Sequence, residues 1–310
     1  MQDCGDSFKI RNKFAFIKFI LPCHKELSMV TVKDLHFGYS KKKEVFSGLN
    51  LHLHGGHIYG LLGKNGSGKS TLLRNLYGLL YPRKGSIDVL NFNPKCRLPS
   101  FLQKVFMVPE EFHVADIHIN ELIKYHSSFY PQFDLEQFKK YLADFEIPHD
   151  QSLQQVSYGQ KKKVLISLGL ATNASLLLMD EPTNGLDIIS KSQFRKIMSG
   201  FVTREKCIII STHQVRDLEN LIDRIMIIDD AVILLDRKIE DIARKLSFKL
   251  SQDDQPPADS LYSESSVNGT VFVSTGTGSE ETKVDLELLY KSVMANPQKI
   301  KDLFGEQDAA

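Results

Sequence analysis

The segment from Gly63 to Ser70, which reads GKNGSGKS, constrains this chain more than any other part of its sequence. It fits the pattern G-x-x-x-x-G-K-[ST], with an apolar run at 58–62 before it and a helical run at 71–77 after it. In a strand, loop and helix context, the glycines let backbone N–H groups surround phosphates, while the lysine and the helix N-terminus add positive charge. We therefore predict a nucleotide phosphate site in which Lys69 reaches the outer phosphates and Ser70 binds Mg²⁺. The residues of this loop expected to bind nucleotide are Gly63, Lys64, Asn65, Gly66, Ser67, Gly68, Lys69, Ser70 and Thr71.

A second signal lies at the end of another apolar run. Residues 176–179 are all apolar and are followed directly by Asp180 and Glu181. A buried strand that ends in two carboxylates can bring one to the water shell of Mg²⁺ and the other to the water that attacks a phosphate. We assign these roles to Asp180 and Glu181, respectively. Alone, the pair also fits a strand-ending turn with acidic caps, an alternative that the phosphate loop makes the weaker one.

The pattern of apolar residues indicates an α/β fold. Short alternating or apolar runs between residues 30 and 108 are typical of strands, and residues 112–155 change to helical spacing. Strands return at 176–179 and 207–210 as continuous apolar runs, each after a helical segment, which is typical of parallel strands buried on both faces. We therefore predict an α/β core with an inserted helical region.

The composition changes after about Lys249. Residues 252–257 (QDDQPP) break any regular element, and Asn268-Gly269 between two short runs is a strong hairpin signal. A helix is predicted to begin after Asp285. The C-terminal part is therefore expected to be a small ββα appendage.

Charge and cysteine content exclude several classes of protein. Lys and Arg total 39 against 38 Asp and Glu. The resulting net charge of +1 is too small for the broad positive surface of a dedicated nucleic-acid binder. The four cysteines form no C-x-x-C pair, so neither a disulfide framework nor a zinc site is indicated. The apolar stretch at 14–21 is less than half of the ~20 residues that a membrane-spanning helix needs. We expect a cytoplasmic protein and assign no function to residues 1–28.

Two groups of side chains have a simple structural interpretation. The lysine runs at 41–43 and 161–163 are expected to form solvated turns or helix faces rather than a nucleic-acid site. The aromatic residues Tyr125, Phe129 and Phe133 are expected in the core of the helical region. A groove that accepts a helix of a membrane partner is the alternative for these aromatics.

Four short motifs follow the phosphate loop in a fixed order. They are Val156–Gln160 (VSYGQ), Asp180–Thr183 (DEPT), Gly185–Asp187 (GLD) and Ser211–His213 (STH). In order and spacing this set resembles the ATP-binding subunits of ABC transporters, with their signature, catalytic-glutamate strand, D-loop and switch histidine. The resemblance covers roughly residues 30–246.

The resemblance implies a domain organisation. Residues 29–246 would form an ABC ATPase domain, which is a P-loop NTPase core with an antiparallel β subdomain and an inserted α-helical subdomain at about 112–172. Residues 247–310 would form a small C-terminal domain, and residues 1–28 an N-terminal extension. The cofactors implied are ATP and Mg²⁺.

The resemblance also implies a role for each site residue. Tyr39 would stack on adenine, Glu181 would act as the catalytic base, and His213 and Lys69 would contact the γ-phosphate. Ser70, Asp180 and Glu110 would surround Mg²⁺. The signature residues would face the γ-phosphate of a partner in a head-to-tail dimer, and Asp187 lies in the D-loop. The signature residues that carry this role are Ser157, Gly159 and Gln160.

The chain departs from the family pattern at three positions. The signature has Tyr158 in place of its first glycine and Val156 in place of leucine. Glu110, in Met107–Glu111 (MVPEE), stands where the family has a glutamine. The retained Ser157, Gly159 and Gln160 indicate that the site is still competent, and a glutamate can still reach a Mg²⁺-bound water.

These observations favour an ATP-hydrolysing subunit that powers transport, with export as the preferred direction. Its partners would be a separate transmembrane permease and a second ATP-binding subunit, identical or different, on the inner face of the cell membrane; no nucleic acid is expected. The alternative is a soluble ABC ATPase that acts on nucleic acid, ribosomes or an assembly scaffold. The single core and the absence of a long coiled-coil insertion count against it. A catalytically silent regulator is disfavoured because Lys69, Asp180, Glu181 and His213 are all present.

Overall fold

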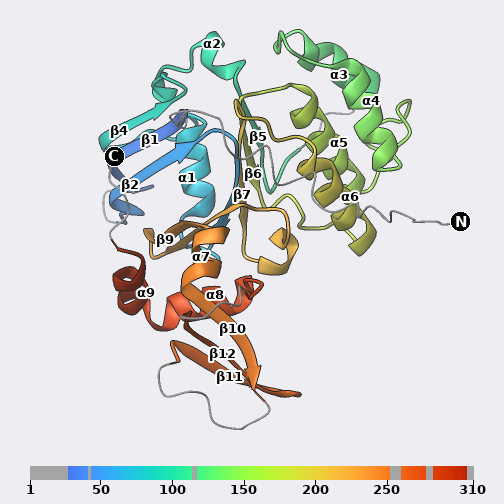
Figure 1. The fold of residues 1–310 in the computed structure, drawn as a ribbon. Helices are drawn as coiled ribbons and strands as arrows, with labels where there is room; N and C mark the ends of the chain where they lie inside the picture. Colours follow the sequence, from blue (N-terminus) through green and yellow to red (C-terminus); the bar gives the residue numbers. More distant parts are fainter. Residues whose placement is uncertain (1–26, 41–42, 114–116, 252–259, 277–281, 306–310) are drawn as a thin grey trace, which may run out of the picture.

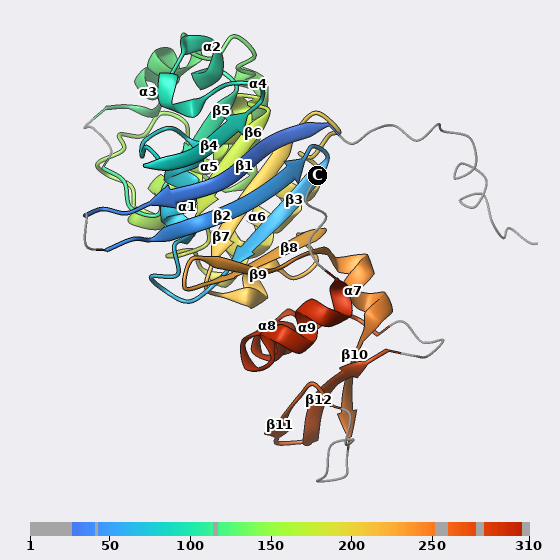
Figure 2. The same cartoon turned by 90° about the vertical axis from the view of Figure 1, so that its left-hand side faces the viewer.

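The computed structural model describes residues 27–40, 43–113, 117–251, 260–276 and 282–305. In these residues the chain forms a central six-stranded sheet with the order β5-β6-β7-β3-β8-β9 (Figure 1; β3 and β8 are labelled in Figure 2). The first five of these strands are parallel, and β9 pairs with β8 in the antiparallel sense. Their bounds are β3 His57–Leu62, β5 Val105–Val108, β6 Leu176–Asp180, β7 Cys207–Thr212, β8 Arg224–Asp229 and β9 Val232–Lys238.

Alternate residues of the central strands serve two separate apolar cores. In β3, Ile58 and Leu62 pack in one cluster with the helical region, whereas Tyr59 and Leu61 pack in the other. All five residues of β6 are buried, and its four apolar residues divide between the two clusters in the same way. Burial on both faces explains why the central strands read as continuous apolar runs.

One face of the central sheet is covered by helices of the inserted region and by the helix after β6. These are α3 (Ile119–Ser127), α4 (Leu135–Asp144), α5 (Tyr158–Ala171) and α6 (Ile188–Ser199). Asp134 caps α4: its carboxylate accepts a hydrogen bond from the Gln137 N–H at 2.9 Å. The predicted placement of Tyr125 and Phe129 in the core is wrong, because their side chains are 59% and 68% exposed. On α3, Ile119 is buried and Leu122 and Ile123 pack against the core, and Phe133 also packs there.

The opposite face carries α1 (Lys69–Leu76) and an antiparallel sheet of order β2-β1-β4. The strands are β1 Ser28–Phe37, β2 Phe46–His54 and β4 Lys84–Val89, and two short helices follow, η1 Pro94–Cys96 and α2 Pro99–Leu102. Buried side chains of this sheet, of α1 and of β3 form the second core. The phosphate loop therefore lies between a buried strand and a largely buried helix.

The C-terminal part differs from the predicted ββα arrangement by one strand and one helix (Figure 2). Strand β10 pairs with the hairpin strand β12, so the sheet order is β10-β12-β11. The second helix, α9, begins at Pro297, which is a favoured first residue of a helix. The bounds are α7 Ile239–Lys245, β10 Leu246–Ser251, β11 Tyr262–Ser266, β12 Gly269–Thr275, α8 Leu286–Ala295 and α9 Pro297–Phe304.

This C-terminal part shares its apolar core with the rest of the chain. Leu288 and Leu289 of α8 belong to the same buried cluster as Leu218 of η2 (Val215–Leu218), the short helix after β7. The Arg216 guanidinium also contacts the Glu287 carboxylate at 3.1 Å. The appendage therefore rests directly on the segment that follows His213.

No helix in the described ranges is both long and apolar enough to span a bilayer. Predictions that concern residues 1–26, Lys41 and Lys42, and the break at 252–257 lie outside the described residues.

Candidate active site

The phosphate loop occupies residues 63–68, between the end of β3 and the first residue of α1. Gly66 and Gly68 adopt φ values of +82° and +106°, which a side chain would strain. The Lys69 ammonium donates hydrogen bonds to the carbonyl oxygens of Gly63 at 2.7 Å and Lys64 at 3.1 Å. Lys69 is 6% exposed, and burial lowers the pKa of its ammonium while Glu181, Asp180 and Glu110 oppose that shift. The loop thus holds one buried cation among three carboxylates.

The Lys64 side chain contacts a different part of the structure. Its ammonium forms ion pairs with Asp229 at 2.8 Å and Asp230 at 3.4 Å, both at the turn between β8 and β9. The Ala231 N–H in the same turn donates to the Ser67 carbonyl at 3.2 Å. Within the loop, backbone N–H groups rather than the Lys64 side chain are therefore suited to phosphate.

Asp180 ends β6 beside the first turn of α1. One of its carboxylate oxygens, Oδ1, accepts hydrogen bonds from the Ser70 hydroxyl at 3.0 Å and the Ser211 hydroxyl at 2.6 Å. The other, Oδ2, is buried and has no hydrogen-bond partner among the described residues, and neither has the buried hydroxyl of Ser67. A buried carboxylate oxygen beside a serine hydroxyl matches the oxygen ligands and water shell that Mg²⁺ prefers. The residues present therefore fit this metal.

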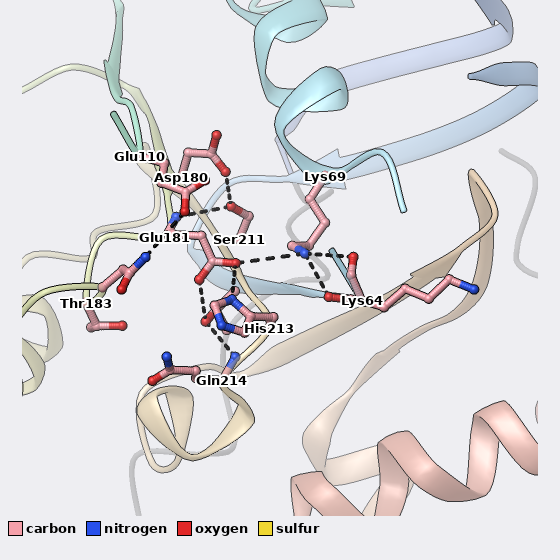
Figure 3. A network of polar contacts seen from close by, with 12 residues as sticks. Lys64, Lys69, Glu110, Asp180, Glu181, Thr183, Ser211, His213 and Gln214 are labelled. Atoms are coloured by element: carbon pink, nitrogen blue, oxygen red, sulfur yellow. Dashed lines mark hydrogen bonds and ion pairs between the residues drawn. The ribbon is translucent and has the colours of Figure 1, made fainter. Parts of the chain in front are cut away.

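Glu181 lies at the centre of the polar cluster (Figure 3). It is 4% exposed and has a left-handed backbone with φ of 46°, a strained conformation for a residue other than glycine. Its Oε1 lies 3.8 Å from the Lys69 ammonium and 2.8 Å from His213 Nδ1, while Oε2 accepts a hydrogen bond from the Thr212 hydroxyl at 3.0 Å. These contacts turn the carboxylate toward the phosphate loop.

The strand β7 supplies one hydroxyl donor to each of the two carboxylates. Ser211 and Thr212 end this strand and reach Asp180 and Glu181, respectively, because β6 and β7 are neighbours with Asp180 opposite Ser211. His213 follows directly. Of these three residues, only His213 was predicted as a site residue from the sequence. Their position at the end of an apolar strand next to the acidic strand was the signal that could have identified them.

The acidic loop after β6 is held by a second polar cluster. The Thr183 hydroxyl donates to Asp217 Oδ2 at 2.6 Å, and the Lys191 ammonium donates to both oxygens of the same carboxylate at 3.0 and 2.8 Å. Asp217 belongs to η2 and is 7% exposed. This cluster, which joins segments far apart in sequence, had no signal in the sequence.

Three other predicted site residues, Tyr39, Asp187 and Glu110, lie in three different places. Tyr39 is 61% exposed, and its hydroxyl forms a 3.1 Å hydrogen bond with Thr71, so its ring lies beside the start of α1. Asp187 caps α6 by accepting a hydrogen bond from the Ser190 N–H at 2.8 Å, which lowers the pKa of its carboxyl. Glu110 accepts a hydrogen bond from the Asn184 side chain at 3.3 Å.

The signature residues lie at the start of α5. Ser157 and Gln160 form a capping box, in which the Ser157 hydroxyl accepts from the Gln160 N–H at 3.3 Å and the Gln160 side chain accepts from the Ser157 N–H at 2.8 Å. No hydrogen bond or ion pair in the described ranges joins these residues or Gly159 to the phosphate loop of the same chain. The structure therefore brings Lys69, Ser70, Asp180, Glu181 and His213 together, and leaves the signature outside that cluster.

Known proteins that are similar to this chain in sequence are ATP-binding proteins of ABC transporters. A family model described as "ABC transporter" matches residues 46–184. The "Cobalt import ATP-binding protein CbiO" of Salmonella typhimurium strain LT2 is 34% identical over 217 residues, which is 67% of this chain and 77% of that protein. The "ABC transporter ATP-binding protein YtrB" of Bacillus subtilis strain 168 is 30% identical over 189 residues. That match covers 60% of this chain and 64% of YtrB, so the chain spans less than two thirds of this relative.

Among solved structures, the one titled "Structure of ATP binding subunit of ABC transporter" superposes with a TM-score of 0.62 at 23% identity. The superposition covers 70% of this chain and 92% of the chain in the solved structure. At this level of identity the match supports the α/β fold with its antiparallel and mixed sheets.

Proposed function

We propose that this chain, which belongs to the family of ABC transporter ATPases, binds ATP with Mg²⁺ at the phosphate loop and hydrolyses it to power transport through a separate membrane-spanning partner. One observation carries the proposal: Glu181 lies 3.8 Å from the Lys69 ammonium and 2.8 Å from His213, and the Ser70 hydroxyl lies 3.0 Å from Asp180. A cation, a base and a metal site thus meet at one edge of the sheet.

In the proposed reaction, the chain positions and neutralises the phosphates. The backbone N–H groups of residues 63–68 and the Lys69 ammonium bind the β- and γ-phosphates. On binding, phosphate oxygens take the place of the Gly63 and Lys64 carbonyl oxygens as acceptors for the Lys69 ammonium. Ser70 and Asp180 would hold Mg²⁺, which supplies further positive charge when bound. Glu181 orients the attacking water and accepts its proton. His213, hydrogen-bonded to Glu181, is placed to contact the γ-phosphate.

We propose that the complete site needs a second ATP-binding subunit. Ser157, Gly159 and Gln160 lie at the N-terminus of a 14-residue helix, where backbone N–H groups favour an anion. The large apolar side chains of Ile188 and Ile189, next to Asp187, are 85% and 69% exposed, which suits a surface that a partner covers. The signature of one subunit would then face the γ-phosphate bound to the other, in a homodimer or a heterodimer.

The membrane partner is proposed to dock on the inserted helical region. Tyr125 and Phe129 expose more than half of their surface on this region, and exposed aromatic side chains are typical of protein interfaces. This arrangement would place the chain on the inner face of the cell membrane. Export is the proposed direction. The reason is that this chain, with Glu110 in the segment before the helical region, resembles some exporter-type ATPases at this position. Import, the function printed in the name of the CbiO relative, is the alternative.

Two measurements test the proposal. Purified protein should hydrolyse Mg-ATP, and Glu181→Gln should bind ATP, hydrolyse it slowly and accumulate as a dimer in sizing with light scattering. A wild-type protein without ATPase activity, or a variant that stays monomeric at saturating Mg-ATP, contradicts this mechanism.

The transport function is tested by affinity capture from gently solubilised host membranes. We expect a multi-span membrane protein in stoichiometric amount, and a loss of it when Tyr125 and Phe129 are both changed to serine. Recovery from the soluble fraction with ribosomal or nucleic-acid partners would leave the ATPase intact and refute transport.

A further inference from the structure

Tyr158 replaces a glycine of the family signature, and its side chain makes specific contacts with a distant loop. Its hydroxyl donates a hydrogen bond to the Glu110 carbonyl oxygen at 2.6 Å. Its ring stacks on that of Phe112, with 5.3 Å between the ring centroids and 24° between the planes. A glycine could make neither contact. The start of α5 is therefore tied to the segment 109–112, called here the Glu110 segment.

Lys162, one helical turn further along α5, supports the same attachment. Its ammonium donates to the carbonyl oxygens of Glu110 at 2.9 Å and Pro109 at 3.2 Å, and lies 5.7 Å from the centre of the Phe112 ring. The residue is 0% exposed, so the expectation that residues 161–163 form a solvated face is wrong for Lys162. A buried ammonium is stable only with such acceptors around it. Residues i and i+4 of one helix thus converge on a single backbone carbonyl.

The Glu110 segment in turn contacts the acidic loop after β6. The Glu110 carboxylate accepts a hydrogen bond from the Asn184 side chain at 3.3 Å, and the Asn184 N–H donates to the Glu181 carbonyl at 3.2 Å. Tyr158 also lies against Gly185, where an added Cβ would come within 3.3 Å of its ring. Tyr158, although 48% exposed, therefore contacts two loops that carry predicted site residues.

We propose that Tyr158 is a positioning residue that locks the Glu110 segment to the start of α5, so that Glu110 and the signature residue Ser157 keep a fixed relative position during hydrolysis. This inference rests on the proposed ATPase function. With the hydroxyl removed, Lys162 alone holds the Glu110 carbonyl, and the carboxylate of Glu110 occupies a wider range of positions. Positioning of catalytic groups affects the rate of the chemical step more than the affinity for substrate.

The test compares Tyr158→Phe, which keeps the ring and removes only the hydroxyl, with Tyr158→Gly, which restores the family residue. Tyr141→Phe is the matched control, because Tyr141 lies in the same helical region and its hydroxyl has no hydrogen bond among the described residues. Loss of one such bond predicts a kcat for Tyr158→Phe that is about 3- to 10-fold lower, with KM for Mg-ATP within about twofold of wild type. Tyr158→Gly loses the ring contact as well and should lose roughly a further threefold or more.

A second readout does not depend on activity. Amide hydrogen exchange of residues 110–113, measured without nucleotide, should be about 3- to 10-fold faster in Tyr158→Phe than in wild type and unchanged in Tyr141→Phe. Thermal unfolding should remain near that of wild type for both phenylalanine variants.

Each other outcome decides against a specific claim. Wild-type exchange and kcat in Tyr158→Phe would overturn the inference. So would faster exchange throughout the helical region together with a lower melting temperature, which would indicate a general structural role. A wild-type protein without ATPase activity would refute the proposed function, while the exchange measurement would still report on the attachment.

Discussion

The hydrogen bond from Ser211 to Asp180 offers a quantitative test of how the acidic site is stabilised. The Ser211 hydroxyl is 0% exposed and donates to the Asp180 carboxylate at 2.6 Å. Ser211→Ala removes one of the two hydroxyls that bind this buried carboxylate. A hydrogen bond to a charged group contributes about 1.5–3 kcal/mol, so we expect the free energy of unfolding to fall by about 2 kcal/mol.

Ser167→Ala is a matched control for this prediction. Ser167 is also 0% exposed, but its hydroxyl donates to the uncharged carbonyl of Lys163, one turn earlier in α5, at 2.9 Å. Alanine is also the better helix former by a few tenths of a kcal/mol. The two effects nearly cancel, so Ser167→Ala should cost no more than about 0.5 kcal/mol.

The assay is urea unfolding of both variants beside wild type, followed by circular dichroism and extrapolated with a common slope. In a chain of this size a loss of about 2 kcal/mol should also lower the melting temperature by roughly 3 °C. If Ser211→Ala is no less stable than Ser167→Ala, the charged acceptor does not strengthen the bond and the reasoning is refuted.

Three further changes have distinct expected results. Lys69→Ala should weaken ATP binding by roughly 10- to 100-fold, because it removes the buried cation of the phosphate loop; wild-type affinity in calorimetry would contradict the assignment of this loop. The pKa of Glu264 is lowered, first by its hydrogen bond with Lys291, so the stabilising contribution of the pair is complete above the ordinary carboxyl pKa and is lost as pH falls through the lowered value. Lys291→Met should therefore flatten the acid limb of the stability profile below about pH 5, and an unchanged limb would exclude this pair as its source. Leu289→Ala, at a 0% exposed site in the apolar core that the appendage shares with η2, should cost about 2–5 kcal/mol in urea unfolding, whereas a near-neutral effect would mean that the appendage does not pack in this core.

The sequence by itself determined the parts of this protein that depend on neighbouring residues. The phosphate loop, its flanking strand and helix, and the cap at Asp134 each involve residues only a few positions apart, whose geometry follows from local backbone rules. The continuous apolar runs at 176–179 and 207–210 also predicted buried parallel strands, because a strand covered on both faces has no polar side.

Only the tertiary structure decided which of several equivalent residues are buried or paired. Lys162 looks like its neighbours in the sequence yet is buried against Glu110, and Tyr125 has the spacing of a core residue yet is exposed. Likewise, the bond from Ser211 to Asp180 and the pairing of β10 with β12 join segments brought together by the fold. The physical reason is that a periodic pattern identifies the faces of an element, whereas long-range packing determines what covers each face.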